Sequence, residues 1–394
     1  MTKKQKPSIW IIPVIVFSQF AGTSLWFAGN AVLPDLQAYL QLSGSQVLGN
    51  ITSAVQLGFI LGTLVFAFFA ISDKFSPRRI FLVCALLGAV ANMTILWLAT
   101  NLFSLLLLRF LTGFFLAGIY PIGMKIAAGW YQKSLGKAIG FLVGALVLGT
   151  AFPHLLKSIG GALSWKTVLQ AVSLIAAVGG AAMYLLVPDG PYISKGAGFN
   201  PKVLLQMFRT KDFRCAAFGY FGHMWELYTF WAYVPVILQQ YAQANHWQAN
   251  LSWWAFVVIA VGSIGCIVGG VASGKIGSAK IAVIQLGISG LMCLLSPLLF
   301  QLSPVSFLAL LVIWGITVVG DSPQFSALTA QTAPQAYIGS ALTIVNSVGF
   351  AITIISIQFV NYLAQLMAPQ YIFVTLLIGP LFGLWAMYPL YHKK

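Results

Sequence analysis

Runs of about 20 apolar residues recur along almost the whole chain, and they restrict the fold more than any other feature. A helix of that length crosses the hydrocarbon layer of a bilayer. Only 7% of the 394 residues are charged, whereas soluble domains carry about 25%. The sequence therefore predicts an all-α membrane protein with 12 transmembrane helices. The twelve runs lie at residues 10–33, 48–71, 80–99, 103–125, 138–158, 167–187, 213–236, 252–273, 280–300, 305–328, 339–364 and 370–389.

The basic residues favour one orientation of these helices. The formal net charge is +15, which in a soluble protein would suggest nucleic-acid binding. With the N-terminus inside, all of the 21 basic residues except Arg109, Lys157 and Lys166 fall in cytoplasmic segments, as the positive-inside rule requires. We therefore expect a multi-pass protein of the bacterial inner (cytoplasmic) membrane with both termini in the cytoplasm. The charge then needs no nucleic acid as a partner.

A long polar interval and a weak internal repeat divide the chain into halves. The interval is rich in Pro, Gly and basic residues, and an Asn-Pro pair within it favours a short helix at the membrane surface. Pro34 and Pro235 lie near the ends of the first and seventh expected helices. The segment "GIYP" at 118–121 aligns with "GDSP" at 320–323. The offsets of 201 and 202 residues are nearly constant, and such a match indicates a duplicated six-helix bundle. The expected domains are an N-terminal six-helix bundle (1–187), a cytoplasmic linker with a short interfacial helix (188–212) and a C-terminal six-helix bundle (213–394).

Three short motifs give the chain a resemblance to the major facilitator superfamily over nearly its whole length. "SDKFSPRR" (72–79) is similar to the family's loop signature G-x-x-x-D-(R/K)-x-G-(R/K)-(R/K), although Phe69 and Ser76 replace its glycines. "RFLTG" (109–113) resembles the family's fourth-helix signature, and "GALSWKTV" (161–168) resembles its loop after helix 5. The resemblance implies two pseudo-symmetric bundles that expose a central site to each side of the membrane in turn.

Two further segments resemble a narrower group. "GHMWELY" (222–228) and "DSPQFSAL" (321–328) are similar to parts of porters grouped loosely with nitrate and cyanate carriers. Nitrate porters carry an arginine in helices 2 and 8, and this chain has none in either expected helix. The resemblance therefore implies a small organic solute, anionic or zwitterionic, rather than nitrate.

Of the six acidic residues, Glu226 and Asp321 alone fall well inside expected helices. An ionised carboxylate there costs about 3 kcal/mol unless it is paired. His223 lies three residues before Glu226 and shares its helical face. The simplest interpretation is proton coupling, because a carboxyl that meets the two sides in turn can load and release a proton. The alternatives are a structural hydrogen bond from Glu226 to a neighbouring Trp or Tyr, and a satisfied buried histidine.

Arg109 lies within the outer part of its expected helix. The resemblance implies a role in proton transfer or in balancing substrate charge, and the alternative is an arginine that extends to the membrane surface. If Arg109 and His154 face the cavity, the cavity is net positive and suits an anionic or zwitterionic solute.

Aromatic and polar residues at comparable depth are the candidate substrate contacts, although aromatic residues near helix ends more often form an interfacial belt. Pro121 and Pro323 are expected to bend helices 4 and 10, which would expose backbone groups or be ordinary kinks. The substrate-binding candidates are Trp26, Asn30, Tyr120, His154, Tyr228, Phe230, Trp231, Gln324 and Asn346.

The cytoplasmic signature carries the expected conformational gate. Its charges could form ion pairs that hold the two bundles together when the cavity opens outward. Gly274 takes the place of the acidic residue in the second half, so the predicted latch is asymmetric. The gate residues are Asp73, Lys74, Arg78 and Arg79.

No ATP-binding loop, catalytic triad or metal-ligand pattern is visible, so we expect no enzyme, catalytic residue, metal or cofactor. We interpret the chain as a proton-coupled secondary transporter, a monomer whose partners are a small-molecule substrate, protons and the lipid bilayer. One alternative is a proton-driven exporter of amphipathic compounds of the drug or siderophore type, although the helix-5 antiporter signature is incomplete. The other is a membrane-embedded sensor or enzyme, which would need a further soluble domain or a catalytic set.

Overall fold

The computed structural model describes residues 8–393 except 43, 45, 132–134, 160–162, 194–202 and 204–205. Every regular element in that part of the chain is helical. Ten helices in it are long and apolar enough to cross a membrane. The shorter apolar helix α1 (Ile11–Thr23) and the 34-residue helix α13 (Lys211–Ala244) complete the set. The predicted all-α fold with twelve spanning segments is therefore confirmed.

Several spanning segments of the first half are broken into two or three helices. The first segment consists of α1, α2 (Ala28–Ala31) and α3 (Leu33–Tyr39). The elements that follow are α4 (Gln46–Phe68), α5 (Ile71–Lys74), α6 (Pro77–Met93) with α7 (Ile95–Leu98), α8 (Leu102–Leu116) with α9 (Tyr120–Trp130), α10 (Leu135–Ile159) and α11 (Trp165–Leu186).

The second half begins with the long helix α13 and also contains broken segments. Its other elements are α14 (Leu251–Ala260) with α15 (Gly262–Ile276), α16 (Ser278–Leu299), α17 (Pro304–Gly320) with α18 (Ser322–Thr332), η1 (Gln335–Tyr337), α19 (Ile338–Leu363), α20 (Pro369–Ile372), η2 (Phe373–Leu377) and α21 (Ile378–Tyr391).

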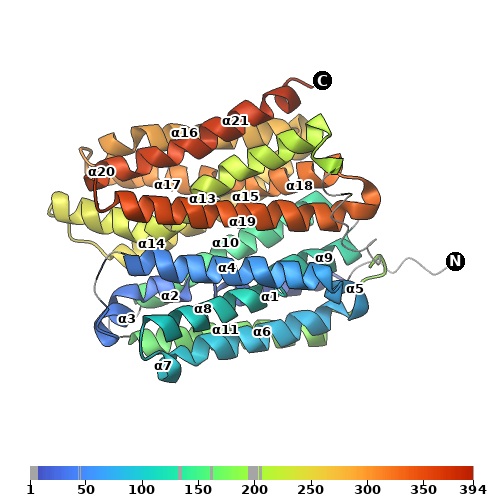
Figure 1. Ribbon diagram of the computed structural model, residues 1–394, viewed down its shortest axis with the longest axis horizontal. Helices are drawn as coiled ribbons and strands as arrows, with labels where there is room; N and C mark the ends of the chain where they lie inside the picture. The colour runs from blue at the N-terminus through green and yellow to red at the C-terminus, as the bar shows by residue number, and fades with distance from the viewer. Residues whose placement is uncertain are drawn as a thin grey trace.

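The helices run side by side, with the first half of the chain below and the second half above in Figure 1. Helix α5 and the last turn of α21 lie toward one end of the molecule, which we call the terminal end, and α3 and α14 mark the opposite, far end (Figure 1). The halves meet along α4 against α19 and along α10 against α14 and α15. The domain boundaries stay a prediction, and most of the expected interfacial helix lies outside the described residues.

Proline interrupts the fourth spanning segment of each half, which is helix 4 in the first half and helix 10 in the second. Helix 4 is interrupted between α8 and α9, where Pro121 occupies the first turn of α9. Helix 10 is interrupted at Asp321, and Pro323 occupies the first turn of α18. A proline there displaces no intrahelical hydrogen bond, but its ring prevents the preceding helix from continuing. The two predicted bends are confirmed, and both lie beside the residues described below.

Glycine allows α4 and α8 to touch through their backbones. A Cβ atom on Gly113 would lie 2.0 Å from the backbone oxygen of Val55, and one on Gly58 would lie 2.0 Å from that of Phe110. Side chains of any size would separate the two helices, so this small-residue contact fixes how closely they pack.

We predict that Gly113→Ala lowers the free energy of unfolding by about 1–3 kcal/mol, because the new methyl group forces two helix backbones apart. Gly287→Ala is the matched control, since a Cβ atom on that helical glycine meets nothing within 4 Å. Titration of the purified proteins with a denaturing detergent, followed by circular dichroism, measures both. Equal stability of the two variants would contradict the packing argument.

Candidate functional site

The opened turn between α1 and α2 is held by one buried arginine. Arg109, on α8, donates from Nη2 to the backbone oxygens of Leu25, at 3.1 Å, and Trp26, at 2.5 Å. Its Nη1 donates to Asn92 Oδ1 at 3.1 Å. A carbonyl freed by a helix break has no water to bind inside a membrane, so it needs such a donor. The guanidinium therefore makes the break possible.

Arg109 is fully buried rather than extended to the membrane surface. None of the ion pairs in the described part of the chain includes it. Asn92, which orients the guanidinium, donates in turn to Ser173 Oγ and to the Leu169 backbone oxygen. The first half thus keeps a positive charge at its centre that no carboxylate of the described residues balances.

An aromatic cluster joins the two halves next to this break. Trp26 lies 5.5 Å from Tyr228 and 5.4 Å from Phe350, measured between ring centroids. Phe27 lies against Tyr228 and Trp231. Arg109 holds the backbone of Trp26, so the guanidinium also fixes where the indole ring meets the second half. The cross-half aromatic cluster comprises Trp26, Phe27, Phe59, Tyr228, Trp231 and Phe350.

Several hydrogen-bonding atoms around this cluster are buried without a partner among the described residues. They include the indole N–H groups of Trp26 and Trp231, Nε of Arg109 and Oδ1 of Asn30. Asn30 uses its amide N–H₂ on Thr52 Oγ1, at 2.7 Å. An unpaired buried donor costs about 1–3 kcal/mol, so such groups mark places where a ligand or water can bind. Three of these four atoms are donors, which fits a ligand rich in acceptors.

Tyr220, on α13, extends the site toward helix 10. Its ring centroid lies 5.7 Å from that of His223 and 6.3 Å from that of Phe325, which is on α18. The predicted residues Tyr120, on α9, and Tyr228, on α13, come from opposite halves of the chain, and both are buried.

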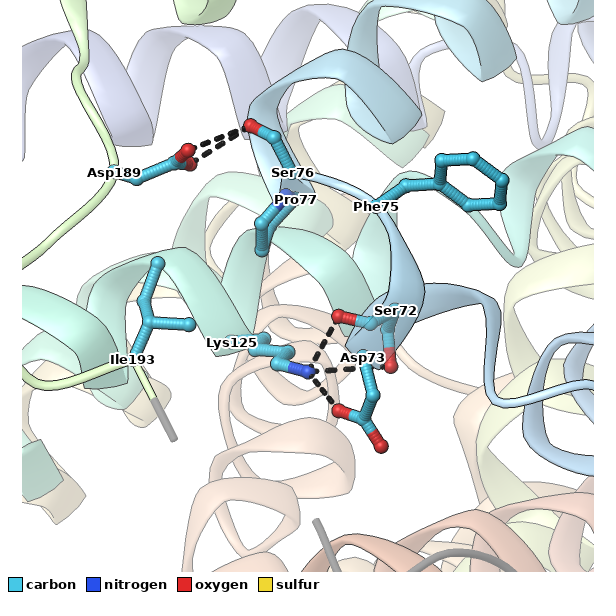
Figure 2. Close-up of a pocket in the computed structure, with 8 residues that line it drawn as sticks. All are labelled: Ser72, Asp73, Phe75, Ser76, Pro77, Lys125, Asp189 and Ile193. Atoms are coloured by element: carbon cyan, nitrogen blue, oxygen red, sulfur yellow. Dashed lines mark hydrogen bonds and ion pairs between the residues drawn. The ribbon is translucent and has the colours of Figure 1, made fainter. Parts of the chain in front are cut away.

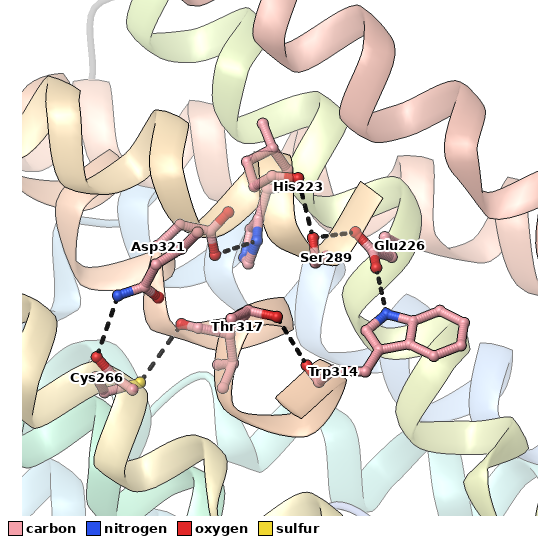
Figure 3. Close-up of polar contacts among 11 residues, drawn as sticks. His223, Glu226, Cys266, Ser289, Trp314, Thr317 and Asp321 are labelled. Atoms are coloured by element: carbon pink, nitrogen blue, oxygen red, sulfur yellow. Dashed lines mark hydrogen bonds and ion pairs between the residues drawn. The ribbon is translucent and has the colours of Figure 1, made fainter. Parts of the chain in front are cut away.

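His223 and Asp321 form a buried pair within the second half (Figure 3). Nδ1 of His223 lies 2.8 Å from Oδ1 of Asp321, and both side chains are at most 1% exposed. Asp321 is the N-cap residue of α18, but its side chain accepts no capping hydrogen bond from that helix. Nε2 of His223 has no partner among the described residues. Besides their mutual contact, Nε2 of His223 and Oδ2 of Asp321 are therefore both buried without a hydrogen-bond partner in the described part of the chain.

Glu226 has a different environment, although it lies one turn beyond His223 on α13. Its carboxylate accepts from Trp314 Nε1 at 2.7 Å and from Ser289 Oγ at 2.9 Å (Figure 3). It also accepts from Cys293 Sγ at 3.2 Å. All three donors come from α16 and α17 of the same half. The geometry matches the structural alternative weighed from sequence, a hydrogen bond to a tryptophan of a neighbouring helix.

Four other predicted substrate residues are less closely grouped. Phe230 packs on Trp314, with ring centroids 4.7 Å apart, and therefore faces α17. His154 is buried on α10, and its Nε2 has no partner in the described part. Gln324 is buried on α18, and Asn346 is half-buried on α19.

Two of the predicted gate residues form ion pairs, one within the first half and one with the linker. Asp73 accepts from Lys125 Nζ at 2.5 Å, beside a hollow of about 220 Å³ (Figure 2). Arg78 lies 4.0 Å from Asp189 and donates to the Tyr184 backbone oxygen. Lys74 and Arg79 are exposed at the same end. Their role as a gate between halves stays a prediction.

Polar contacts between the halves lie toward the far end. Gln358, on α19, donates to Ser53 Oγ at 2.9 Å, and its other partner is Asn50. Asn250, at the start of α14, donates to the Ser158 backbone oxygen at 3.1 Å. These neutral hydrogen bonds join the halves on the opposite side from the Asp73 and Arg78 pairs.

Sequence reasoning missed some residues of this region. Phe59 and Phe350 are two among 29 phenylalanines, and no local pattern distinguishes them. Gln19 and Gln56 are fully buried, and their side-chain amides have no partners in the described residues. The rule applied to Glu226, that a polar residue inside an apolar helix marks a site, would have found both amides.

Comparison with known proteins gives one family. A family model described as the Major Facilitator Superfamily matches residues 15–357, which extend from α1 into α19. No curated protein matches the chain. The similarity to nitrate and cyanate porters stays a resemblance of two segments.

We predict that Arg109→Met destabilises the turn between α1 and α2, so that its backbone N–H groups exchange with solvent more readily. The substitution leaves two carbonyls and the Asn92 oxygen unpaired, each at a cost of about 1–3 kcal/mol. Hydrogen–deuterium exchange should become faster in peptides covering 24–31 and stay unchanged in α16. Arg79→Met, at an exposed arginine, is the control. Unaltered exchange at 24–31 in Arg109→Met would show that the guanidinium does not hold the break.

Proposed function

Because the chain belongs to the Major Facilitator Superfamily, we propose that this secondary transporter moves a small organic anion or zwitterion together with protons. The observation that carries the proposal is the central site shared by the halves, with its unpaired N–H donors beside the unbalanced charge of Arg109. A carboxylate-bearing solute satisfies both, because carboxylate oxygens accept strong hydrogen bonds from charged and neutral donors. The cross-half aromatic cluster would hold its apolar part.

We assign substrate contact first to the residues that meet at the boundary between halves. Trp26 and Asn30 come from the first half, and Tyr228 and Trp231 come from the second. Tyr120 supplies a hydroxyl from α9. A solute that touches both sides of the boundary can alter the balance between inward-open and outward-open arrangements, since it interacts with both moving parts. His154, Phe230, Gln324 and Asn346 remain candidates of lower rank.

We assign proton coupling to the pair His223 and Asp321. A histidine and a carboxylate in contact titrate as a unit and hold different numbers of protons in different surroundings. The pair sits where helix 10 is broken, so rearrangement of α17 against α18 would alter its access to water. Glu226 was predicted for the same task, but three donors hold its carboxylate, which favours a structural role. Arg109 contributes charge and position.

Alternating access requires that the contacts between the halves separate at one end of the molecule while the other end closes. We propose that the far end faces outward and that the neutral hydrogen bonds of Gln358 and Asn250 close it in this arrangement. Opening that end would require the terminal end to close instead. Asp73 and Arg78 would then exchange partners within the first half for partners in the second, as expected of the gate.

The solute class can be tested with the purified protein. A panel of aliphatic and aromatic carboxylates, amino acids, inorganic anions and amphipathic cations is screened for a rise in unfolding temperature. Active compounds are then added to proteoliposomes containing a trapped pH dye. We expect a carboxylate or amino acid to stabilise the protein and to acidify the lumen. Stabilisation by amphipathic cations alone would favour the exporter instead.

We predict that Asp321→Asn abolishes proton movement driven by the identified solute but preserves exchange of labelled for unlabelled solute. Removal of the charge uncouples the proton while the halves still move. Glu226→Gln is the matched control, since the amide keeps the shape and one acceptor, and it should retain proton movement. Coupling retained in Asp321→Asn, or lost only in Glu226→Gln, would overturn the assignment.

A further inference from the structure

An apolar groove of about 500 Å³ runs along the membrane-facing side of the boundary between halves. The groove is formed by α1 and α10 of the first half and α15 of the second. Phe17 and Leu148 are 39% and 38% exposed along it. Because these are spanning helices, the groove opens to hydrocarbon rather than to water. Its lining residues are Pro13, Val16, Phe17, Phe20, Phe141, Gly144, Ala145, Leu148 and Ile267.

The lining of the groove includes two small residues of α10, Gly144 and Ala145, beside the larger side chains of Phe17, Phe141 and Ile267. A Cβ atom on Gly144 would lie 3.6 Å from both Ile267 Cγ1 and the Ser263 backbone oxygen, so α10 and α15 are in contact here. The groove therefore borders a contact between the two halves, and an occupant would touch residues of both.

A lysine stands at the terminal-end mouth of the groove. Lys137 lies four residues before Phe141 on α10, and its Nζ is 5.9 Å from the centre of that ring, which lines the groove. The lysine is exposed, and none of the ion pairs in the described residues includes it. Lysines at helix ends extend toward lipid headgroups, where basic residues between spanning helices bind anionic heads.

We propose that this groove is a binding site for an anionic glycerophospholipid. One acyl chain lies in the apolar groove between α1, α10 and α15, and the phosphate pairs with Lys137. The combination of a chain-shaped apolar surface with a cation at one end matches a lipid and no part of a water-soluble solute. A bound chain would fill the boundary between halves and stabilise the arrangement seen here. The site is separate from the proposed substrate region and does not depend on it.

The test uses the full-length protein in liposomes that contain a phosphatidylglycerol with a photoreactive diazirine in its acyl chain. Irradiation and peptide mass spectrometry locate the cross-links. We expect labelling concentrated on Phe17, Phe141 and Leu148. Lys137→Gln should lower that labelling about fivefold, the factor that one lysine near an anionic surface is worth. The same label on phosphatidylcholine should cross-link less and should not respond to Lys137→Gln.

Two matched controls separate a site from general lipid contact. Lys280→Gln removes an exposed lysine at the start of α16 and should leave the labelling unchanged. Leu148→Trp fills the groove and should abolish labelling there, whereas Leu174→Trp, at a 67% exposed position of α11, should not.

Two results would overturn the proposal. Labelling spread evenly over the membrane-facing residues would mean ordinary annular lipid. Unchanged labelling in both Lys137→Gln and Leu148→Trp would remove the assigned contacts. If Leu148→Trp instead blocks binding of an amphipathic compound from the panel while lipid labelling persists, the groove is an entry for solute and not a lipid site.

Discussion

The grip of Arg109 on the opened turn between α1 and α2 is the interaction on which the central site depends. A membrane interior offers no water to a free carbonyl, so the first spanning helix can be broken only where protein donors replace the lost bonds. Arg109 supplies them to Leu25 and Trp26, and Asn92 fixes its orientation. The break then turns Trp26 and Phe27 toward the second half. A charge that is costly to bury thus holds the backbone geometry of the break.

The two intramembrane carboxylates illustrate how environment separates residues of one type. Glu226 is surrounded by three donors and is satisfied whether or not a ligand is present. Asp321 has one side-chain partner, His223, and lies at a helix break. A group whose hydrogen bonds are complete resists change, whereas a group with incomplete bonding responds to a proton, a ligand or water. This contrast is the reason for assigning coupling to Asp321.

Sequence predicted the parts of this molecule that follow from hydrophobicity and from proline. Twelve apolar runs predicted the spanning segments, and Pro121 and Pro323 predicted the breaks in helices 4 and 10. Contacts between side chains of different helices could not be predicted from the sequence, because they depend on how the helices are rotated relative to one another. The sequence places His223 and Glu226 on one face, yet their partners differ, Asp321 for one and Trp314 for the other. The break between α1 and α2, at residues 24–27, contains no proline, and its cause is visible only in the hydrogen bonds that Arg109 donates there.

The distribution of strong and weak contacts is itself an argument for movement between halves. Each of the five ion pairs in the described chain joins residues of one half or its edge with the linker, among them Asp35 with Lys157 and Asp73 with Lys125. The described contacts across the boundary are packing of aromatic and other apolar groups and neutral hydrogen bonds. Separating an ion pair inside a membrane is costly, because each charge would be left unpaired, whereas aromatic surfaces part without leaving unpaired charges. This distribution of contacts favours the proposal that each half moves as a unit and that the two halves separate along the boundary between them.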